Sequence, residues 1–339
     1  MDAPTTAQLT KKDFTTNQEP RWCPGCGDYA VLNTVRKVLP ELGIPKENFV
    51  WVSGIGCSSR FPYYVETFGL HTIHGRALPI ATGIRVANPQ LSVWVATGDG
   101  DALSIGGNHL MHCLRRNVDI KVLLFNNRIY GLTKGQYSPT SELGKVTKTS
   151  PSGSIDSPID PLTLAIGCGA TFVARSYDVA GDHLAETLKR AANHRGTAFV
   201  EILQNCNVFN DGAFDAITNR ATVQDRQLRV EHGRPLRFGP NQSRGLRLNS
   251  RTLSLDIVEN ADDPKHESEL FVFDESNPLH AGLLARLSGE GVPTPMGVLH
   301  QVRRPTYEAR LDEQRSHNAS RQYTSLDALF RSGHTWRVD

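Results

Sequence analysis

The chain of 339 residues contains no uninterrupted apolar run that approaches the roughly 18 to 20 residues of a membrane-spanning helix. Its first twenty residues, MDAPTTAQLTKKDFTTNQEP, are polar and lack the apolar segment of a secretory signal peptide. Internal repeats and low-complexity tracts are absent as well. We therefore expect a cytoplasmic protein that does not interact with a membrane.

Cysteine is also scarce, and the charge is nearly balanced. Six cysteines are too few for a disulfide scaffold at this length, so some of them can be metal ligands. A net charge of +2 gives no overall case for nucleic-acid binding. One local excess stands out, because eight arginines from Arg220 to Arg251 face only two acids, Asp225 and Glu231. This segment is either a solvated face or a docking surface for an acidic partner.

Between about residues 28 and 205, short apolar runs alternate with longer segments of helical spacing, such as residues 76–88, 101–117 and 178–196. The apolar runs are nearly continuous and rich in Val and Phe, as is typical of strands covered on both faces. This alternation predicts an α/β fold with a doubly wound parallel sheet. The strand candidates are residues 49–54, 91–98, 120–127, 170–176 and 197–203.

The pattern changes after about residue 210. Residues 238–265 are polar and rich in Asn, Ser and Arg, which favours a long surface excursion over a second core. Residues 269–288 then combine a short apolar strand with an amphipathic helix. We divide the chain into a polar N-terminal segment (1–20), a main domain (21–215) and an irregular C-terminal appendage (216–339).

The most specific stretch is ATGDGDALSIGGNHLMHCLRRNVDIKVLLFNNRIYGLTKGQ, residues 96–136. One predicted strand ends at Gly98-Asp99-Gly100, and the next ends at Asn126-Asn127. The two motifs, G-D-G and N-N, are separated by 25 residues. Both ends fall at the carboxyl edge of a parallel sheet, where ligands bind. Mg²⁺ prefers oxygen ligands, which the Asp99 carboxylate, the Asn127 amide and the backbone carbonyl of Ile129 can supply.

Two features of the same stretch suit a diphosphate that such an ion would hold. The glycines allow close approach of the backbone, and the helix that begins near Asp101 supplies N–H donors and a positive dipole end. This arrangement resembles the motif of enzymes that bind thiamine diphosphate, in which G-D-G is followed by N-N after about 25 to 30 residues. The alternative is a loop with Asp and Gly beside an unrelated Asn turn.

The cysteines then become informative. Cys23 and Cys26 have C-x-x-C spacing, which fits a zinc site, a redox dithiol or half of an iron–sulfur site. Cys57 and Cys206 each follow a predicted strand and so reach the same edge as Asp99. Zinc sites usually pair two C-x-x-C units, whereas two of these ligands are isolated, which favours a [4Fe–4S] cluster. Cys113 and Cys168 lie in apolar surroundings and are expected to be core thiols, and His109 and His112 to be structural.

Together, these motifs resemble the β subunit of 2-oxoacid:ferredoxin oxidoreductases over roughly residues 18–215. The resemblance lies in WCPGCGD, SGIGCSSR, HTIHGRALPIATGI, GDGDALSIGGNH, FNNRIYGLTKGQ and QNCNVFND. It implies the diphosphate-binding type of thiamine diphosphate domain. By motif position, the residues that line the cofactor would be Ile55, Gly56, Cys57, Ser58, His74, Gly100, Asp101, Gly131 and Leu132. His74 is otherwise a hydrogen-bonded residue at a strand end.

The resemblance also implies partners. Thiamine is activated by a glutamate in a pyrimidine-binding domain, and only about twenty residues precede Cys23, so we expect that domain in an α subunit. The family pairs two αβ units, oxidatively decarboxylates a 2-oxo acid, passes two electrons singly through the cluster to ferredoxin and transfers the acyl group to coenzyme A. We expect a chain that is inactive alone, and the 220–251 arginines are then candidates for docking ferredoxin.

Two cations suggest the substrate. Arg60 can bind a carboxylate in a bidentate manner, and Lys134 can meet a second carboxylate. A dicarboxylate such as 2-oxoglutarate is therefore expected, with pyruvate or broad specificity as the alternative; either cation can instead be surface charge or contact the α subunit. Two other classes stay open, a non-oxidative thiamine-dependent lyase or decarboxylase subunit with zinc and a scaffold subunit without catalysis.

Overall fold

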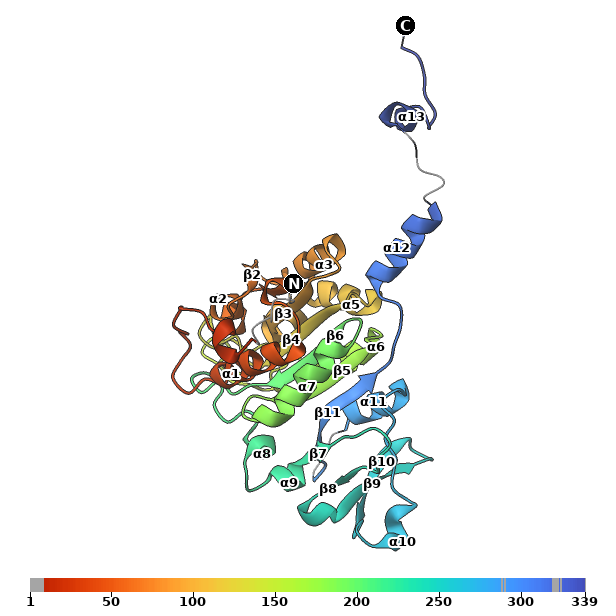
Figure 1. The fold of residues 1–339 in the computed structure, drawn as a ribbon. Helices are drawn as coiled ribbons and strands as arrows, with labels where there is room; N and C mark the ends of the chain where they lie inside the picture. Colours follow the sequence, from red (N-terminus) through yellow and green to blue (C-terminus); the bar gives the residue numbers. More distant parts are fainter. Residues whose placement is uncertain (1–8, 288, 290, 319–322, 324, 339) are drawn as a thin grey trace, which may run out of the picture.

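The computed structural model describes residues 9–287, 289, 291–318, 323 and 325–338. Its centre is an eight-stranded sheet, which Figure 1 shows between layers of helices. In spatial order the strands are β2 (Phe68–His71), β1 (Phe49–Ser53), β3 (Ser92–Gly98), β4 (Ile120–Asn126), β6 (Ala198–Leu203), β5 (Phe172–Tyr177), β11 (Thr294–Gln301) and β7 (Gln227–Arg229). The six strands from β2 to β5 are mutually parallel, and β11 is antiparallel to β5. The predicted parallel α/β class is confirmed.

Helices cover both faces of this sheet, as a doubly wound fold requires. One face packs against α1 (Asp28–Val38), α2 (Phe61–Tyr64) and α7 (Gly181–Asn193). The other packs against α3 (Ala77–Ala87), α5 (Gly107–Arg116), α6 (Pro161–Gly167) and α11 (Pro278–Ala285). All five predicted strands are present within a residue or two of their expected bounds. Strands with both faces buried read as apolar runs, which is why these five were visible in the sequence.

The helical segment expected over residues 101–117 is two helices, α4 (Asp99–Leu103) and α5. The chain breaks at Ser104, whose φ of −94° and ψ of −106° are not helical. Gly106 follows in close contact with the preceding helix, because a Cβ there would lie 2.5 Å from the carbonyl oxygen of Asp101. Because of this break, α4 lies at the carboxyl edge of the sheet, while α5 packs against the same face as α3, α6 and α11.

The expectation of a long surface excursion over residues 238–265 is wrong. This segment contributes to a three-stranded antiparallel sheet of β8 (Arg237–Phe238), β9 (Arg244–Asn249) and β10 (Ser254–Glu259). Leu246, which pairs with Ile257, is fully buried in the main core, whereas Val258, which pairs with Gly245 on the opposite face, is 6% exposed and packs with Ala261 and Leu270. Charged residues occur on both faces, Arg244 and Glu259 on one and Arg247 and Asp256 on the other, so neither strand reads as an apolar run. Two short helices, α8 (Asp215–Thr218) and α9 (Val223–Arg226), lie between β6 and β7, and α10 (Pro264–Glu267) follows β10.

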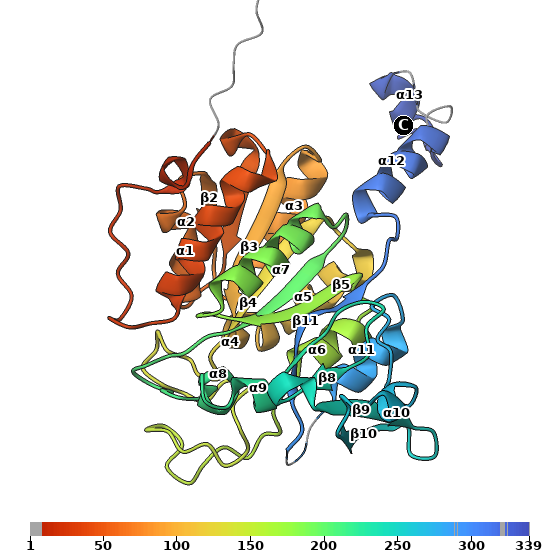
Figure 2. The ribbon, with the colours of Figure 1, turned by 60° about the horizontal axis from the view of Figure 1, so that its bottom comes forward.

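The two ends of the chain differ in how they pack. The N-terminal segment is held by the 3₁₀ helix Lys11–Phe14, whose Phe14 is fully buried with its ring centroid 5.7 Å from that of Phe49. At the other end, α12 (Tyr307–Asn318) extends away from the body of the sheet in both views, followed by α13 (Leu326–Phe330) (Figures 1 and 2). Within the described ranges, no helix has the length and apolarity needed to cross a membrane.

Candidate functional site

The predicted ligand residues converge at the carboxyl edge of β1, β3, β4 and β6. Two adjoining cavities occur there, one of about 180 Å³ and one of about 210 Å³. Four residues line both of them: Cys57, Asn127, Gly131 and Leu132. We call the smaller one the cofactor cavity and the larger one the cysteine cavity.

The cofactor cavity contains nearly all of the residues predicted to bind cofactor or divalent ion. Those that line it are Ile55, Gly56, Cys57, Ser58, His74, Asp99, Gly100, Asn127, Ile129, Gly131 and Leu132. Gly100 has a specific steric role, because a Cβ there would lie 2.2 Å from the ring of Tyr130. The Tyr130 hydroxyl also donates to the Gly100 carbonyl at 3.0 Å. Tyr130 thus packs against the G-D-G turn and completes one wall of the cavity.

Asp99 is 2% exposed and is held by two hydroxyl groups from the loop after β4. Ser138 Oγ and Thr140 Oγ1 both contact Asp99 Oδ2, at 2.5 and 2.6 Å. Burial raises the pKa of Asp99 to about 6, against the opposing effect of these hydroxyl contacts. A buried carboxylate without a cation is costly, so this environment fits a residue that binds a divalent ion.

Asp101 does not line either cavity but lies directly behind the cofactor cavity. Its Oδ1 accepts from the backbone N–H groups of Ile55 and Gly75, at 3.1 and 2.8 Å. Its Oδ2 accepts from the Thr97 hydroxyl at 2.7 Å, and His74 Nδ1 lies 2.6 Å from Oδ1. These four contacts make Asp101 the group that positions the Ile55 and His74 walls.

All four predicted cluster ligands, Cys23, Cys26, Cys57 and Cys206, line the cysteine cavity. A Cβ placed on Gly131 would lie 3.6 Å from both the Cys57 and the Cys206 sulfur, so a glycine here keeps the space between the two sulfurs open.

Hydrogen bonds tie the loops that carry these cysteines to one another. Trp22 Nε1 donates to the Cys57 carbonyl at 2.7 Å, which joins the C-x-x-C loop to the loop after β1. The backbone N–H of Gly27 donates to the Asn205 carbonyl at 3.2 Å, and Asn207 Nδ2 donates to the Pro24 carbonyl at 2.6 Å. The three cysteine-bearing loops are thus preassembled.

All four cysteines are free thiols, of which Cys26, Cys57 and Cys206 are partly buried and Cys23 is exposed. Burial raises the pKa of Cys57 to about 12, with further contributions from Asp28 and the neighbouring cysteines, and burial also raises the pKa of Cys26. Such thiols become thiolates only when a metal centre compensates their charge. Within the described residues, no three His, Cys, Asp or Glu side chains form a compact set around one ion.

The two predicted substrate cations lie at the cysteine cavity rather than at the cofactor cavity. Arg60 is half-buried, and its Nη1 donates to the Arg21 carbonyl at 3.4 Å. Lys134 is exposed and has a φ of +77°, unusual for a residue other than glycine. In the part of the chain that the structure describes, neither residue pairs with a carboxylate.

The remaining predicted core residues are placed as follows. Cys113 is 3% exposed, in the core beneath the sheet, and Cys168 packs against the same core. His109 contacts Arg76 on the surface of α5. His112 has a buried Nδ1 without a hydrogen-bond partner among the described residues. None of the four lines either cavity.

Several residues of the site were not predicted. Asp28 lines the cofactor cavity, fully buried, with no hydrogen-bond partner for either carboxylate oxygen among the described residues. Burial raises the pKa of this group to about 7. Ser138, Thr140 and Gln204 were also missed. Only their position in the chain could have indicated them. Asp28 directly follows C-P-G-C-G, and Gln204 directly follows β6, at the same edge as Asn127.

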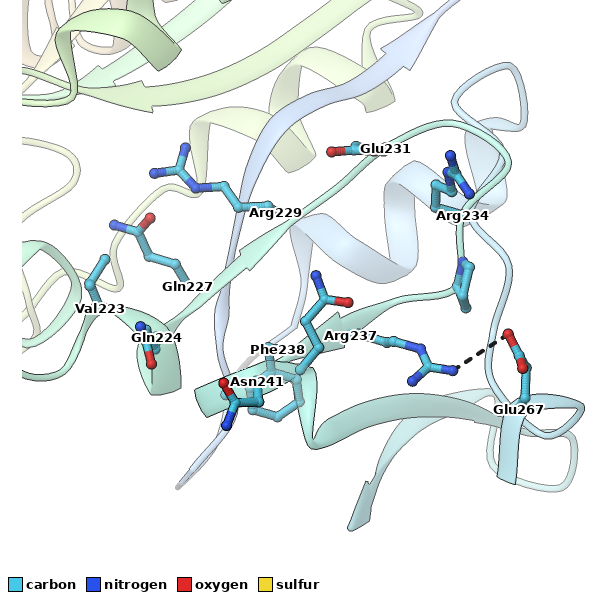
Figure 3. Close-up of a pocket in the computed structure, with 13 residues that line it drawn as sticks. Val223, Gln224, Gln227, Arg229, Glu231, Arg234, Arg237, Phe238, Asn241 and Glu267 are labelled. Atoms are coloured by element: carbon cyan, nitrogen blue, oxygen red, sulfur yellow. Dashed lines mark ion pairs between the residues drawn. The ribbon is translucent and has the colours of Figure 1, made fainter. Parts of the chain in front are cut away.

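The arginine-rich segment lies away from both cavities. It borders a third cavity of about 690 Å³, lined by Arg229, Arg234 and Arg237 among others (Figure 3). Three of its eight arginines form ion pairs, Arg237 with Glu267 at 3.6 Å, Arg247 with Glu269 at 2.6 Å, and Arg244 with Asp225. The other five form no ion pair within the described ranges, so part of the predicted positive surface is uncompensated.

Comparison with known proteins defines the class first. Residues 50–202, which span β1 to β6, match the family model described as thiamine pyrophosphate enzyme, C-terminal TPP binding domain. The match covers both cavity-forming motifs, G-D-G and N-N. The chain therefore contains the thiamine diphosphate-binding domain of a thiamine-dependent enzyme.

The relatives then define the family. The chain is 52% identical over 341 residues to the 2-oxoglutarate oxidoreductase subunit KorB of Mycobacterium tuberculosis, covering 99% of this chain and 91% of that one. It is 50% identical over 190 residues to the β subunit of 2-oxoacid:ferredoxin oxidoreductase 1 of Aeropyrum pernix, covering 56% and 60%. The chain belongs to the β subunits of the 2-oxoacid:ferredoxin oxidoreductases.

A solved structure is similar across nearly the whole fold. It is the 2-oxoglutarate:ferredoxin oxidoreductase from Magnetococcus marinus with 2-oxoglutarate, coenzyme A and succinyl-CoA bound. The TM-score is 0.77 at 34% sequence identity, with 96% of each chain covered. The likeness thus includes the C-terminal region that follows β6.

Proposed function

We propose that this β subunit catalyses, together with an α subunit, the reversible oxidative decarboxylation of 2-oxoglutarate to succinyl-CoA, with electrons passed through a [4Fe–4S] cluster to ferredoxin. One observation carries the proposal: the cofactor cavity and the cysteine cavity adjoin and share Cys57, Asn127, Gly131 and Leu132. A reaction centre and an electron acceptor held in these cavities would be immediate neighbours, as electron removal during turnover requires.

In the cofactor cavity, Asp99, Asn127 and Ile129 would hold Mg²⁺ and, through it, the diphosphate of thiamine diphosphate. The buried Asp99 carboxylate, fixed by Ser138 and Thr140, fits a cation ligand because it has no positively charged partner among the described residues. Asn127 supplies an amide oxygen at the end of β4. Ile55, His74 and the other wall residues would contact the organic part of the cofactor.

In the cysteine cavity, the thiolates of Cys23, Cys26, Cys57 and Cys206 would hold the cluster. Cys57 and Cys206 are isolated residues rather than a second C-x-x-C unit, which supports a cluster over a structural zinc site. When bound, thiamine diphosphate supplies the carbon nucleophile for the 2-oxo group, and the cluster accepts electrons one at a time.

The substrate preference follows from Arg60 and Lys134, two cations without a carboxylate partner among the described residues, placed beside Leu132 where the cavities meet. They suit the two carboxylates of 2-oxoglutarate. The similar Mycobacterium protein is named for 2-oxoglutarate, and the Magnetococcus structure contains it, which supports this choice. Pyruvate or broad specificity is the second candidate, because the Aeropyrum relative is named only for 2-oxo acids.

The α subunit would supply the pyrimidine-binding domain, its activating glutamate and most contacts to coenzyme A, and two αβ units would associate. The test is cofactor analysis of the chain co-purified anaerobically with its α partner. We expect thiamine and magnesium together with four irons and four sulfides per β subunit, as the proposed cluster requires. Zinc without iron would overturn the oxidoreductase proposal and favour the non-oxidative lyase.

A further inference from the structure

Gln204 contacts Asn127, one of the four residues that line both cavities. It directly follows β6 and is 1% exposed. Its backbone N–H donates to the Asn126 carbonyl at 2.9 Å, which extends the pairing of β4 and β6 by one residue. Its side chain lines the cysteine cavity. The position of this side chain is therefore fixed by the sheet rather than by a loose loop.

The side-chain amide of Gln204 uses both of its ends. Oε1 accepts from Asn127 Nδ2 at 2.8 Å. Nε2 donates to the Asn205 carbonyl at 2.6 Å and to the Cys26 sulfur at 3.3 Å. Rotating the amide by 180° would place an oxygen against a carbonyl and a sulfur, and an N–H₂ group against another N–H₂ group. The network therefore permits one orientation of Gln204.

That orientation dictates which atom Asn127 can offer. Because Nδ2 of Asn127 donates to Gln204, Oδ1 is its remaining ligand atom, and it already accepts from the Ile129 backbone N–H at 3.2 Å. A flipped Asn127 would present nitrogen, which does not bind Mg²⁺. Gln204 thus selects the ligating form of Asn127.

The opposite end of Gln204 acts on Cys26. An N–H donor to a thiolate ligand stabilises negative charge on the sulfur, and this charge is greater in the reduced cluster. The hydrogen bond from Gln204 to Cys26 therefore favours the reduced cluster and raises its reduction potential. Removal of the Gln204 N–H donor should lower this potential.

We propose that Gln204 is a positioning residue that serves both centres at once: it holds the Asn127 oxygen for the divalent ion and sets the reduction potential of the cluster through Cys26. The inference rests on the proposed function, since it assumes a cluster on the cysteines and Mg²⁺ at Asn127. No other side chain among the described residues bonds to both Asn127 and a cysteine sulfur.

The experiment uses the intact complex with its α subunit and two variants. Gln204→Met is close in shape and removes both contacts. We expect it to weaken Mg²⁺ binding by roughly 10-fold or more, the usual effect of losing a residue that orients a ligand. We expect the reduced form to be disfavoured about tenfold, a fall of about 59 mV for one electron. Gln204→Glu keeps an acceptor for Asn127 but loses the donor, so the potential should fall while Mg²⁺ affinity changes little.

Gln227→Met is the matched control, because Gln227 is also buried and also donates to a carbonyl, that of Ile217 at 2.8 Å, but lies at the third cavity. Gln227→Met should change neither the reduction potential of the cluster nor the Mg²⁺ affinity. Potentials come from an electron paramagnetic resonance titration, and Mg²⁺ affinity from thiamine diphosphate binding at varied Mg²⁺. A Gln204→Met complex with wild-type potential or wild-type Mg²⁺ affinity would overturn the inference. A wild-type complex without a cluster signal would instead overturn the proposed function.

Discussion

Nδ1 of His74 lies 2.6 Å from Oδ1 of Asp101, and this contact fixes which ring nitrogen carries the proton in the neutral imidazole. A carboxylate only accepts, so Nδ1 carries the proton and Nε2 is the nitrogen that the neutral ring can offer to a bound molecule. The same oxygen accepts from the N–H groups of Ile55 and Gly75. One buried carboxylate therefore orients two walls of the cofactor cavity.

Replacement of Asp101 should accordingly impair cofactor binding. Asp101→Asn removes the charge from four hydrogen bonds, each worth about 1.5–3 kcal/mol when a charged group takes part. We expect thiamine diphosphate affinity to fall by at least about tenfold, measured by titration of the α–β complex. The exposed Asp156, whose carboxylate accepts from the Tyr137 hydroxyl at 2.9 Å, provides the control variant Asp156→Asn. Equal affinities for the two variants would refute the role of Asp101.

Substitution of Asp99 tests both the proposed divalent-ion site and the alternative that the chain is a scaffold subunit without catalysis. Asp99→Asn keeps the shape but removes the negative charge, so we expect thiamine and Mg²⁺ to be lost on gel filtration and activity to fall roughly 100-fold or more. Thr140→Val removes one hydroxyl from Asp99 and should weaken Mg²⁺ binding by about tenfold. Thr163→Val is a suitable control, because the buried Thr163 hydroxyl has no partner among the described residues. Full activity of Asp99→Asn would favour a non-catalytic subunit.

The sequence predicted that the candidate ligands gather at one edge of the sheet, because they follow strands that are visible as apolar runs. Asp99, Asn127, Cys57 and Cys206 are far apart in the chain, yet parallel strands bring their carboxyl ends to one edge. Their motifs also identified the family correctly. This success depended on buried strands, whose composition is distinctive.

What was missed depends on contacts that leave no periodic pattern. Thr140 reaches Asp99 from a loop 41 residues away, and Gln204 reaches Asn127 across 77 residues. β2 is exposed along its length, and β9 and β10 carry charged residues on both faces, so none of them reads as an apolar run. Such features follow from tertiary packing, which a single sequence does not reveal.

Arg60 and Lys134 should decide between dicarboxylate and monocarboxylate substrates. Lys134→Leu removes the cation proposed for the second carboxylate, so kcat/KM should fall roughly 10- to 100-fold for 2-oxoglutarate and little for pyruvate. Arg60→Leu, which removes the proposed bidentate partner, should affect 2-oxo acids of both kinds. Steady-state kinetics with both substrates provides the measurement, with the exposed Lys148→Leu as control. An unchanged preference in Lys134→Leu would assign this lysine to surface charge or to a subunit contact.

The arginine-rich segment is a candidate for docking ferredoxin, an acidic partner in this hypothesis. Arg220, Arg226 and Arg251 are exposed and form no ion pair within the described residues. Reversing all three to Glu should slow ferredoxin reduction at low salt and flatten its dependence on ionic strength, because surface charges steer association. Activity with a small neutral electron acceptor should be retained. An unchanged salt dependence would place ferredoxin elsewhere.

The most direct test of the account is the visible absorbance of the anaerobic α–β complex before and after addition of 2-oxoglutarate with coenzyme A, with pyruvate in a separate sample. We predict a brown chromophore that 2-oxoglutarate bleaches and pyruvate does not, because electrons leave the cofactor cavity for the cluster beside it. Bleaching by pyruvate would retain the family and correct the substrate. A colourless protein, or a chromophore that neither acid bleaches, would contradict the central claim.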